Sequence, residues 1–214
     1  MELSIRNNVN KISAVIPAYN EEKRIEDVIK KTQNFVDEII VVNDCSSDRT
    51  GELAIKTGVK VISNQRKLGY IESIKRAFRE AGGNIVITLD ADGEHNPAEI
   101  PILLKPILNG EADLTLGKRK KIPRISERFF NWLTYFKVKI KDSGTGFRAI
   151  RKELAIKLNL KGKCTCGIFA LEACSHGGRI VEVPITINSV DKKRKIVWHH
   201  LWQFFYILSW MILK

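Results

Sequence analysis

Short apolar runs alternate with segments of helical periodicity through the first half of the chain, and this alternation limits the folds open to it. The runs that are typical of strands cover residues 11–17, 38–43, 60–63, 84–89 and 113–116. Between them, residues 21–35, 48–57, 70–81 and 97–108 carry apolar side chains at helical spacing. Alternating strands and helices predict an α/β fold, in which a mostly parallel sheet is flanked by helices.

The alternation loosens in the second half of the chain. There we predict an amphipathic aromatic helix over residues 126–139, a helix over 151–158 and a last strand over 179–187. A length of 214 residues allows one domain with a sizeable core. The four cysteines are too few for a disulfide framework and the first eleven residues are polar, so we expect reduced thiols and no signal peptide.

Basic and aromatic residues occur together. The net charge of +12 suggests nucleic acid, anionic lipid or phosphorylated small molecules as partners. One basic block, residues 118–121 with Arg124 and Arg128, precedes the aromatic segment 129–136, and a second block, 192–195, precedes the segment 198–210. These two segments contain all four tryptophans. Cations beside aromatic belts are typical of a bilayer interface, so the pattern predicts peripheral binding to a membrane surface.

The strand predicted at residues 84–89 runs into two carboxylates, Asp90 and Asp92. Strand side chains alternate between faces, so two residues this far apart point the same way. In open α/β sheets, ligands bind outside the carboxyl ends of the strands, where this pair falls. Two carboxylates suit a hard divalent cation, with the remaining positions left to phosphates and water. Asp and Gly are also ordinary turn residues after a strand, so the pair alone does not decide between the two readings.

Four segments carry a resemblance to a known family. They are VIPAYNEE at 15–22, VVNDCSSDRT at 41–50, LDADGEHNP at 89–97 and DSGTGFRAIR at 142–151. In order and spacing they resemble family 2 glycosyltransferases of the GT-A fold, and most closely the synthases of dolichol-phosphate or polyprenyl-phosphate mannose and glucose. The resemblance implies a Rossmann-like GT-A domain over residues 1–195, with a nucleotide-sugar half at about 11–92 and an acceptor half at about 93–195. The aromatic, membrane-associated helix would follow at 196–214.

The resemblance also implies roles for individual residues. The nucleotide-sugar pocket would be formed by Pro17, Tyr19, Glu21, Val42, Asp44, Asp90, Ala91, Asp92, Arg119 and Lys195. Mg²⁺ or Mn²⁺ would be held by Asp90, Asp92 and Glu94, the acceptor phosphate by Arg119 and Arg128, and the catalytic residues would be Asp92, Arg119 and Asp142. Tyr19 offers a ring for stacking a base, and Asp44 can accept hydrogen bonds from base or ribose. Asp44 could instead cap the helix that follows it.

The chain departs from the family pattern in three places. Asn43 stands where the family usually has Asp, and Glu94 stands where many relatives have Gln. The late loop that closes over the diphosphate in relatives corresponds to residues 191–195, which lack its glycine and its spacing. Lys195 is the residue that the resemblance assigns to that loop's role.

The implied reaction is a metal-dependent, inverting transfer of a hexose from a donor of the GDP-mannose or UDP-glucose type to polyprenyl or dolichyl phosphate. We expect it at the cytoplasmic face of the cell membrane, with the protein bound peripherally. The metal, Arg119 and a late-loop lysine would stabilise the charge that develops on the departing diphosphate. The acceptor phosphate is already an anion at neutral pH, so the reaction needs no strong general base.

Other readings of the sequence remain open. An enzyme with a soluble or polysaccharide acceptor would need a carboxylate base, for which Asp142 is the candidate. A non-catalytic binder of nucleic acid or anionic lipid would gain nothing from acidic residues clustered in its groove, so we expect no nucleic-acid partner.

Two smaller features also have alternative readings. Cys164, Cys166, Cys174 and His176 could bind zinc, but Cys-x-Cys lacks the usual ligand gap, so structural or buried cysteines are expected. The C-terminal helix carries His199, His200 and Gln203, and one face formed by Trp198, Leu201, Trp202, Phe205, Leu208 and Ile212. We therefore expect it to lie in the membrane plane rather than to span it, or else to pack on the domain or on a partner.

Overall fold

The computed structural model describes residues 10–122, 125–162, 164–190 and 197–213. Their strands form a seven-stranded sheet in the order β3-β2-β1-β4-β6-β5-β7. The strands are β1 Ile12–Ala18, β2 Glu38–Asn43, β3 Lys60–Ser63, β4 Ile85–Thr88, β5 Leu114–Arg119, β6 Arg148–Arg151 and β7 Ile180–Ile185. Neighbouring strands are parallel except where β6 pairs antiparallel with β4 and β5. The mostly parallel sheet predicted from the sequence is therefore confirmed.

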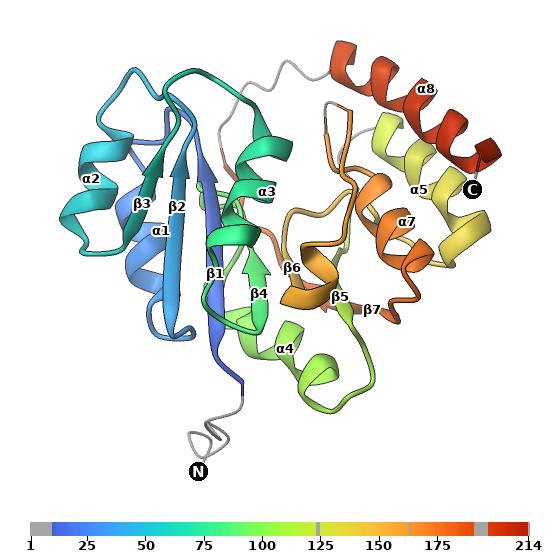
Figure 1. Ribbon diagram of the computed structural model, residues 1–214, viewed down its shortest axis with the longest axis horizontal. Coiled ribbons are helices and arrows are strands. Elements are labelled where there is room, and N and C mark those ends of the chain that lie inside the picture. Colours follow the sequence, from blue (N-terminus) through green and yellow to red (C-terminus); the bar gives the residue numbers. More distant parts are fainter. Residues whose placement is uncertain (1–9, 123–124, 163, 191–196, 214) are drawn as a thin grey trace.

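Helices cover both faces of this sheet (Figure 1). One face is covered by α1 Ile25–Thr32, α2 Thr50–Lys56 and α4 Ile100–Leu108, the last preceded by the 3₁₀ turn η1 Pro97–Glu99. The other face is covered by α3 Tyr70–Glu80, α6 Lys152–Ala155 and α7 Ile168–Ser175. Two further helices, α5 Ile125–Val138 and α8 Val197–Leu213, lie side by side at the α7 end of the molecule (Figure 1).

The pleat of the inner strands divides the core into two parts. In β1, Ala14 and Ile16 pack toward α1 and α4, whereas Val15 packs toward α3 on the opposite face. All three side chains are fully buried. Strands that are covered on both faces read as continuous apolar runs, which is why β1, β2 and β4 could be recognised from the sequence.

The structure corrects two of the predicted elements. Residues 148–151 form the strand β6, which we did not predict, and the helix expected over 151–158 is the single-turn α6. In β6, Arg148 is fully buried, with its guanidinium over the Phe169 ring at 4.3 Å and one nitrogen donating to Thr165 Oγ1 at 2.9 Å. A strand with an arginine at each end does not have the apolar pattern by which buried strands are recognised.

The C-terminal helix α8 is amphipathic as expected. Trp202, Phe205, Leu208 and Ile212, four members of the predicted face, are exposed. Among the described residues, none of the helices is both long enough and apolar enough to cross a bilayer.

Candidate active site

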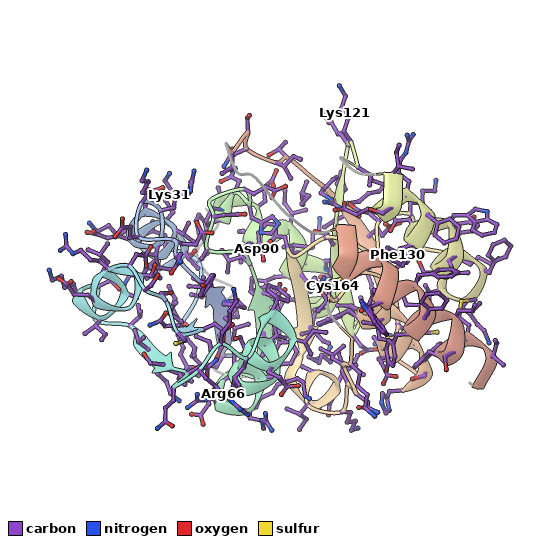
Figure 2. The ribbon with its side chains drawn as sticks, turned by 90° about the horizontal axis from the view of Figure 1, so that it is seen from above. Lys31, Arg66, Asp90, Lys121, Phe130 and Cys164 are labelled. Carbon is purple, nitrogen blue, oxygen red and sulfur yellow. The ribbon has the colours of Figure 1, made fainter. Side chains whose placement is uncertain are left out.

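A cleft of about 1000 Å³ opens where β1, β2 and β4 end. The predicted site residues that line it are Pro17, Tyr19, Glu21, Asp44, Asp90, Ala91, Asp92, Glu94 and Arg119. They come from segments far apart in the sequence and meet because parallel strands direct their carboxyl ends to one edge of the sheet. Residues 67–73 form one wall, and Glu127 with residues 160–162 and 164–166 forms the other. In the view of Figure 2, Asp90 lies near the middle of the molecule, with Cys164 on its α5 side toward Phe130.

Three predicted site residues have other positions. Val42 is fully buried in the core on the α3 face and does not line the cleft. Arg128 is exposed on α5, and its neighbour Glu127 is the one that reaches the cleft. Asp142 is buried behind Arg119. Lys195 lies outside the described residues.

Asp44 anchors one wall of the cleft. Its Oδ1 accepts hydrogen bonds from Asn64 Nδ2 and the Leu68 backbone N–H, and its Oδ2 accepts one from the Gly69 N–H, each at 2.8 Å. Gly69 has φ +90°, a conformation that glycine adopts at little cost, and α3 begins directly after it. Asp44 therefore fixes the loop that leads into α3. The start of α2 is instead bonded by Asp48, which accepts from the Thr50 N–H at 3.0 Å, so Asp44 is not a helix cap.

This loop carries Lys67 to the ring of Tyr19, with the ammonium 3.5 Å from the ring centroid. The Tyr19 side chain is 40% exposed at the mouth of the cleft. Glu21 is buried next to it, with its backbone N–H donating to Thr50 Oγ1 at 2.7 Å and its carboxylate 3.6 Å from the Arg24 guanidinium. The end of the cleft near Tyr19 and Asp44 thus offers an aromatic ring, a cation and carboxylate acceptors.

The turn after β4 is held by its own side chains. Asp92 Oδ1 accepts from the Glu94 N–H at 3.1 Å, and His95 Nδ1 accepts from the Asp90 N–H at 3.1 Å. The His95 ring stacks on Phe147 at 5.1 Å, which fixes its orientation. Asp92 is buried, whereas the Asp90 side chain is 27% exposed. The turn therefore presents both carboxylates to the cleft, with the Asp92 carboxylate and the Asp90 backbone held by hydrogen bonds.

No three His, Cys, Asp or Glu side chains in the described parts of the chain are arranged to hold a metal by themselves. Asp90, Asp92 and Glu94 consequently do not form a three-ligand cage. Mg²⁺ is usually bound by one or two carboxylates and completed by substrate phosphates and water, which is the donor set that Asp90 and Asp92 offer.

Arg119 lies at the opposite end of the cleft, where it is bonded to the carboxylates of Asp142 and Glu127. Its Nε and Nη2 donate to Asp142 Oδ2 and Oδ1, both at 2.8 Å, and Nη2 also donates to Glu127 Oε2 at 2.9 Å. Burial favours a lower pKa for Arg119, but Asp142 and Glu127 outweigh burial and raise that pKa. The guanidinium therefore stays charged, and its remaining nitrogen, Nη1, makes no hydrogen bond within the described part of the chain.

Comparison with known proteins identifies the family. Residues 13–173 match the model of glycosyl transferase family 2. The chain belongs to this family. The family resemblance drawn from the sequence and the GT-A fold that it implied are both confirmed.

Relatives of this family 2 chain act on lipid phosphates and on a small phosphorylated acid, to judge from their names. The chain is 32% identical to the dolichol-phosphate mannosyltransferase of Pyrococcus furiosus, over 94% of this chain but only 64% of the Pyrococcus protein. It is 30% identical to the UDP-N-acetylglucosamine–dolichyl-phosphate N-acetylglucosaminyltransferase of Methanococcus voltae, over 81% of this chain and 84% of that protein. Its fold matches Mycobacterium tuberculosis glucosyl-3-phosphoglycerate synthase in complex with Mn²⁺, UDP and glucosyl-3-phosphoglycerate. That match has a TM-score of 0.78 and 25% identity, over 94% of this chain and 79% of the synthase.

Glu127 is a site residue of this family 2 domain that sequence reasoning missed. It is buried on α5 and shares one face of the helix with Phe130, Asn131 and Thr134. Asn131 Oδ1 accepts from both the N–H and the Oγ of Ser143, so this face holds the segment that carries Asp142. The sequence does contain a pattern that could have identified this face: polar residues recur at helical spacing on a helix that is otherwise aromatic.

The four cysteines form no disulfide, and in the described parts of the chain they belong to no group of three or more side chains that could hold a metal ion. All four are free, and Cys164 and Cys166 belong to the cleft wall. Cys174 and His176 are exposed where α7 ends.

Proposed function

We propose that this chain transfers a hexose from a nucleoside diphosphate sugar to the phosphate of a polyprenyl or dolichyl phosphate. The observation that carries the proposal is a single cleft with strand-end carboxylates at its centre, a buried arginine at one end and an exposed aromatic surface beside that end. The names of the Pyrococcus and Methanococcus relatives support a lipid-phosphate acceptor. The proposal includes donors of the GDP-mannose and UDP-glucose types.

The donor's nucleoside would occupy the end formed by Tyr19, Glu21 and Asp44. Tyr19 supplies an aromatic ring, and Lys67 over that ring supplies a cation for the diphosphate. Asp44 would act mainly through the loop that it fixes, because both of its oxygens already accept hydrogen bonds from that loop.

A divalent cation, Mg²⁺ or Mn²⁺, would be held by Asp90 and Asp92 and would stabilise negative charge on the leaving diphosphate. The Mn²⁺ in the matched synthase supports this assignment. The hard oxygen donors of the two side chains fit such an ion. The Glu94 N–H holds the Asp92 carboxylate and His95 holds the Asp90 backbone before substrate arrives, so less reorganisation is needed at the moment of reaction.

Arg119 would bind the acceptor phosphate through Nη1. Asp142 would act as a positioning residue, because both of its oxygens already accept hydrogen bonds from Arg119. Asp142 is buried behind Arg119 and does not line the cleft, which disfavours it as the general base of a hydroxyl acceptor. A phosphate acceptor needs no such base, so the geometry favours phosphate as the nucleophile, with inversion at the anomeric carbon.

We further infer that residues 1–195 form the transferase domain and that α8, within residues 196–214, associates with the membrane. The exposed aromatic side chains of α5 and α8 would meet the lipid surface, and neighbouring lysines would meet anionic headgroups. The free cysteines support the cytoplasmic face, where nucleotide sugars are available to the cleft.

The test is a transfer assay with purified protein. GDP-mannose, UDP-glucose and UDP-N-acetylglucosamine, each labelled in the sugar, are incubated with polyprenyl phosphate in detergent, and label is counted in the lipid extract. We expect label from one donor, and we expect chelation of divalent ions to abolish the transfer. Asp92→Asn should lower the rate by orders of magnitude while the melting temperature changes little.

The matched control replaces polyprenyl phosphate with 3-phosphoglycerate or with free glucose. Label in a water-soluble product, with none in the lipid, would assign a soluble acceptor instead. Full transfer activity in the presence of a chelator would show that the reaction does not need a divalent cation.

A further inference from the structure

Helix α8 presents two faces to different surroundings. Gln203 and Ile207, one turn apart, are fully buried. Trp202 and Phe205, on the other side of the same turns, are 67% and 58% exposed. A buried glutamine on an apolar helix needs hydrogen-bond partners inside the protein, so its position indicates a specific contact rather than general packing.

The buried face contacts the wall of the cleft. We call residues 160–162 and 164–166, which line the cleft, the rim loop. Gln203 Oε1 accepts from the Cys164 backbone N–H at 3.4 Å, a long hydrogen bond. Gly162 has φ +99°, and a Cβ on it would overlap the Gln203 amide. Just beyond the loop, a Cβ on Gly167 would lie 2.9 Å from Ile207 Cδ1. The helix therefore sits directly on the backbone of the rim loop.

A second contact fixes the far end of α8. Trp210 Nε1 donates to Glu172 Oε1 at 2.5 Å, and Glu172 is fully buried on α7. Glu172 Oε2 also accepts from the Asn159 backbone N–H at 3.1 Å, immediately before the rim loop. The same helix is thus attached to both ends of the segment that carries the loop.

The rim loop lines the same cleft as Arg119 and Glu127. In Figure 2 its Cys164 lies on the side of Asp90 that faces Phe130 of α5, the helix that also carries Glu127. Hydrogen bonding to Cys166 and burial raise the pKa of the Cys164 thiol, and the charge of Glu127 adds to this, as expected for neighbours.

We propose that Gln203 is a positioning residue, through which α8 holds the rim loop in the shape that admits the acceptor phosphate beside Arg119. This inference rests on the proposed function. It gives α8 two separate tasks: its exposed face meets the lipid surface, and its buried face sets the geometry of the acceptor site. Binding of the exposed face at a membrane would consequently stabilise the acceptor end of the cleft and leave the nucleotide end unchanged.

The test compares a buried-face variant with an exposed-face variant of the same helix. Gln203→Met keeps the length of the side chain and removes its amide, including the carbonyl that accepts from Cys164. Phe205→Ser changes only the exposed face. Both full-length proteins are assayed in detergent with farnesyl phosphate, a short acceptor that does not require a bilayer, and separately for binding to anionic vesicles.

We expect Gln203→Met to raise the acceptor KM roughly tenfold to a hundredfold, because small misplacements of a positioning group have effects of this size. The donor KM should change less than about twofold, and vesicle binding should not change. Phe205→Ser should show the reverse: weaker vesicle binding and an unchanged KM for farnesyl phosphate. An unchanged acceptor KM in Gln203→Met, or equal increases in both KM values, would overturn the proposal.

Hydrogen exchange provides a readout that does not depend on activity. The peptide that covers residues 160–167 should exchange faster in Gln203→Met than in the wild type, and at the wild-type rate in Phe205→Ser. This result separates failure of the inference from failure of the proposed function, since it is measured without substrate. If Gln203→Met does not fold, Ile207→Val removes one methyl from the same contact and should have a smaller effect in the same direction; no effect in that variant would also count against the proposal.

Discussion

Gly146 leaves no space for a side chain beside the Asp90 carboxylate. A Cβ at this position would lie 2.6 Å from Asp90 Oδ2, yet Gly146 does not have a positive φ, so alanine suits the backbone. We expect Gly146→Ala to displace the Asp90 carboxylate and to lower turnover at least tenfold, with little change in melting temperature. A double-mutant cycle with Asp90→Asn checks the cause, since the double variant should be no slower than Asp90→Asn alone. Additive losses would show that Gly146 acts by another route.

Arg119 has a structural role in addition to the one proposed for it in catalysis, and this changes how its variants should behave. Arg119→Ala would leave Asp142 and Glu127 buried without their cation, a change that costs about 3–5 kcal/mol in unfolding free energy. The alanine variant should therefore lose stability as well as activity. Arg119→Lys retains the charge but not the fork geometry, so we expect a smaller fall in melting temperature and a rate roughly tenfold to a few hundredfold below wild type. Calorimetry and initial rates on the same samples check both, and an alanine variant with wild-type stability would contradict the buried network.

For single residues, a position could be predicted only where the neighbouring sequence determines it. Asp90 and Asp92 follow a strand directly, so the sequence alone placed them at a sheet edge. The partners of Asp44 could not be predicted, because Leu68 and Gly69 reach it only after β3 has paired with β2. Glu127 could not be paired with Arg119 without knowing how α5 folds back over the cleft.

Among the elements, β5 and β7 are joined by an ion pair between Asp113 and Arg179, the residues that immediately precede them. Asp113 accepts from the Arg179 Nε and backbone N–H at 3.0 Å, and from Arg151 Nε at 3.3 Å. Hydrogen bonding to Arg179 holds the pKa of Asp113 well below its ordinary value of 3.8, at about 2, although burial opposes this. Because the folded-state pKa is depressed, the stabilisation is present above 3.8 and is lost as the pH falls from 3.8 toward about 2.

We therefore expect Asp113→Asn to lower the free energy of unfolding by about 1 kcal/mol at neutral pH, a value discounted for partial exposure. The difference from wild type should disappear in acid, across the range in which Asp113 protonates. Urea unfolding at a series of pH values measures this. Asp27→Asn, which disrupts an exposed ion pair with Lys31 on α1, is the matched control and should change stability by less than about 0.5 kcal/mol. A difference that persists at the lowest pH would argue against the ion pair.

The helices and strands that could be predicted were those whose buried side chains follow a simple pattern along the sequence. Strands covered on both faces and helices with one apolar stripe were recognised in the first half of the chain. The strand β6 was missed because its burial depends on a stacked guanidinium, formed only when Arg148 meets Phe169 of α7. Helix α8 was recognised as amphipathic, but which face would be buried depended on Gln203 and its contact with the rim loop.

On the scale of the whole molecule, aromatic rings and cations gather at one end. Phe129, Trp132 and Phe136 are exposed on α5, where Trp132 is in ring contact with both phenylalanines, and Phe129 also contacts Phe204 of α8. The rings extend outward at this end in Figure 2, and Lys121 precedes α5 in the chain. An exposed apolar surface of this kind, bordered by cations, is what peripheral membrane binding requires.

The last prediction uses two pairs of lysines to test this orientation. Lys120 and Lys121 precede α5, whereas Lys30 and Lys31 lie on α1, away from the aromatic end in Figure 2. Each interfacial lysine contributes about 1 kcal/mol to binding an anionic membrane. Replacing Lys120 and Lys121 with Gln should therefore weaken binding to anionic vesicles by about tenfold or more. Replacing Lys30 and Lys31 with Gln changes the net charge equally and should leave binding almost unchanged.

Sedimentation with vesicles at increasing salt separates the electrostatic and apolar contributions. Salt should weaken wild-type binding, because exposed charges are screened beyond about 10 Å at 0.1 M. Trp132→Ser should weaken the part that persists at high salt, since that part depends on the aromatic rings. Equal losses of vesicle binding from both lysine pairs would mean that binding depends only on net charge. The aromatic end would then not be the surface that contacts the membrane.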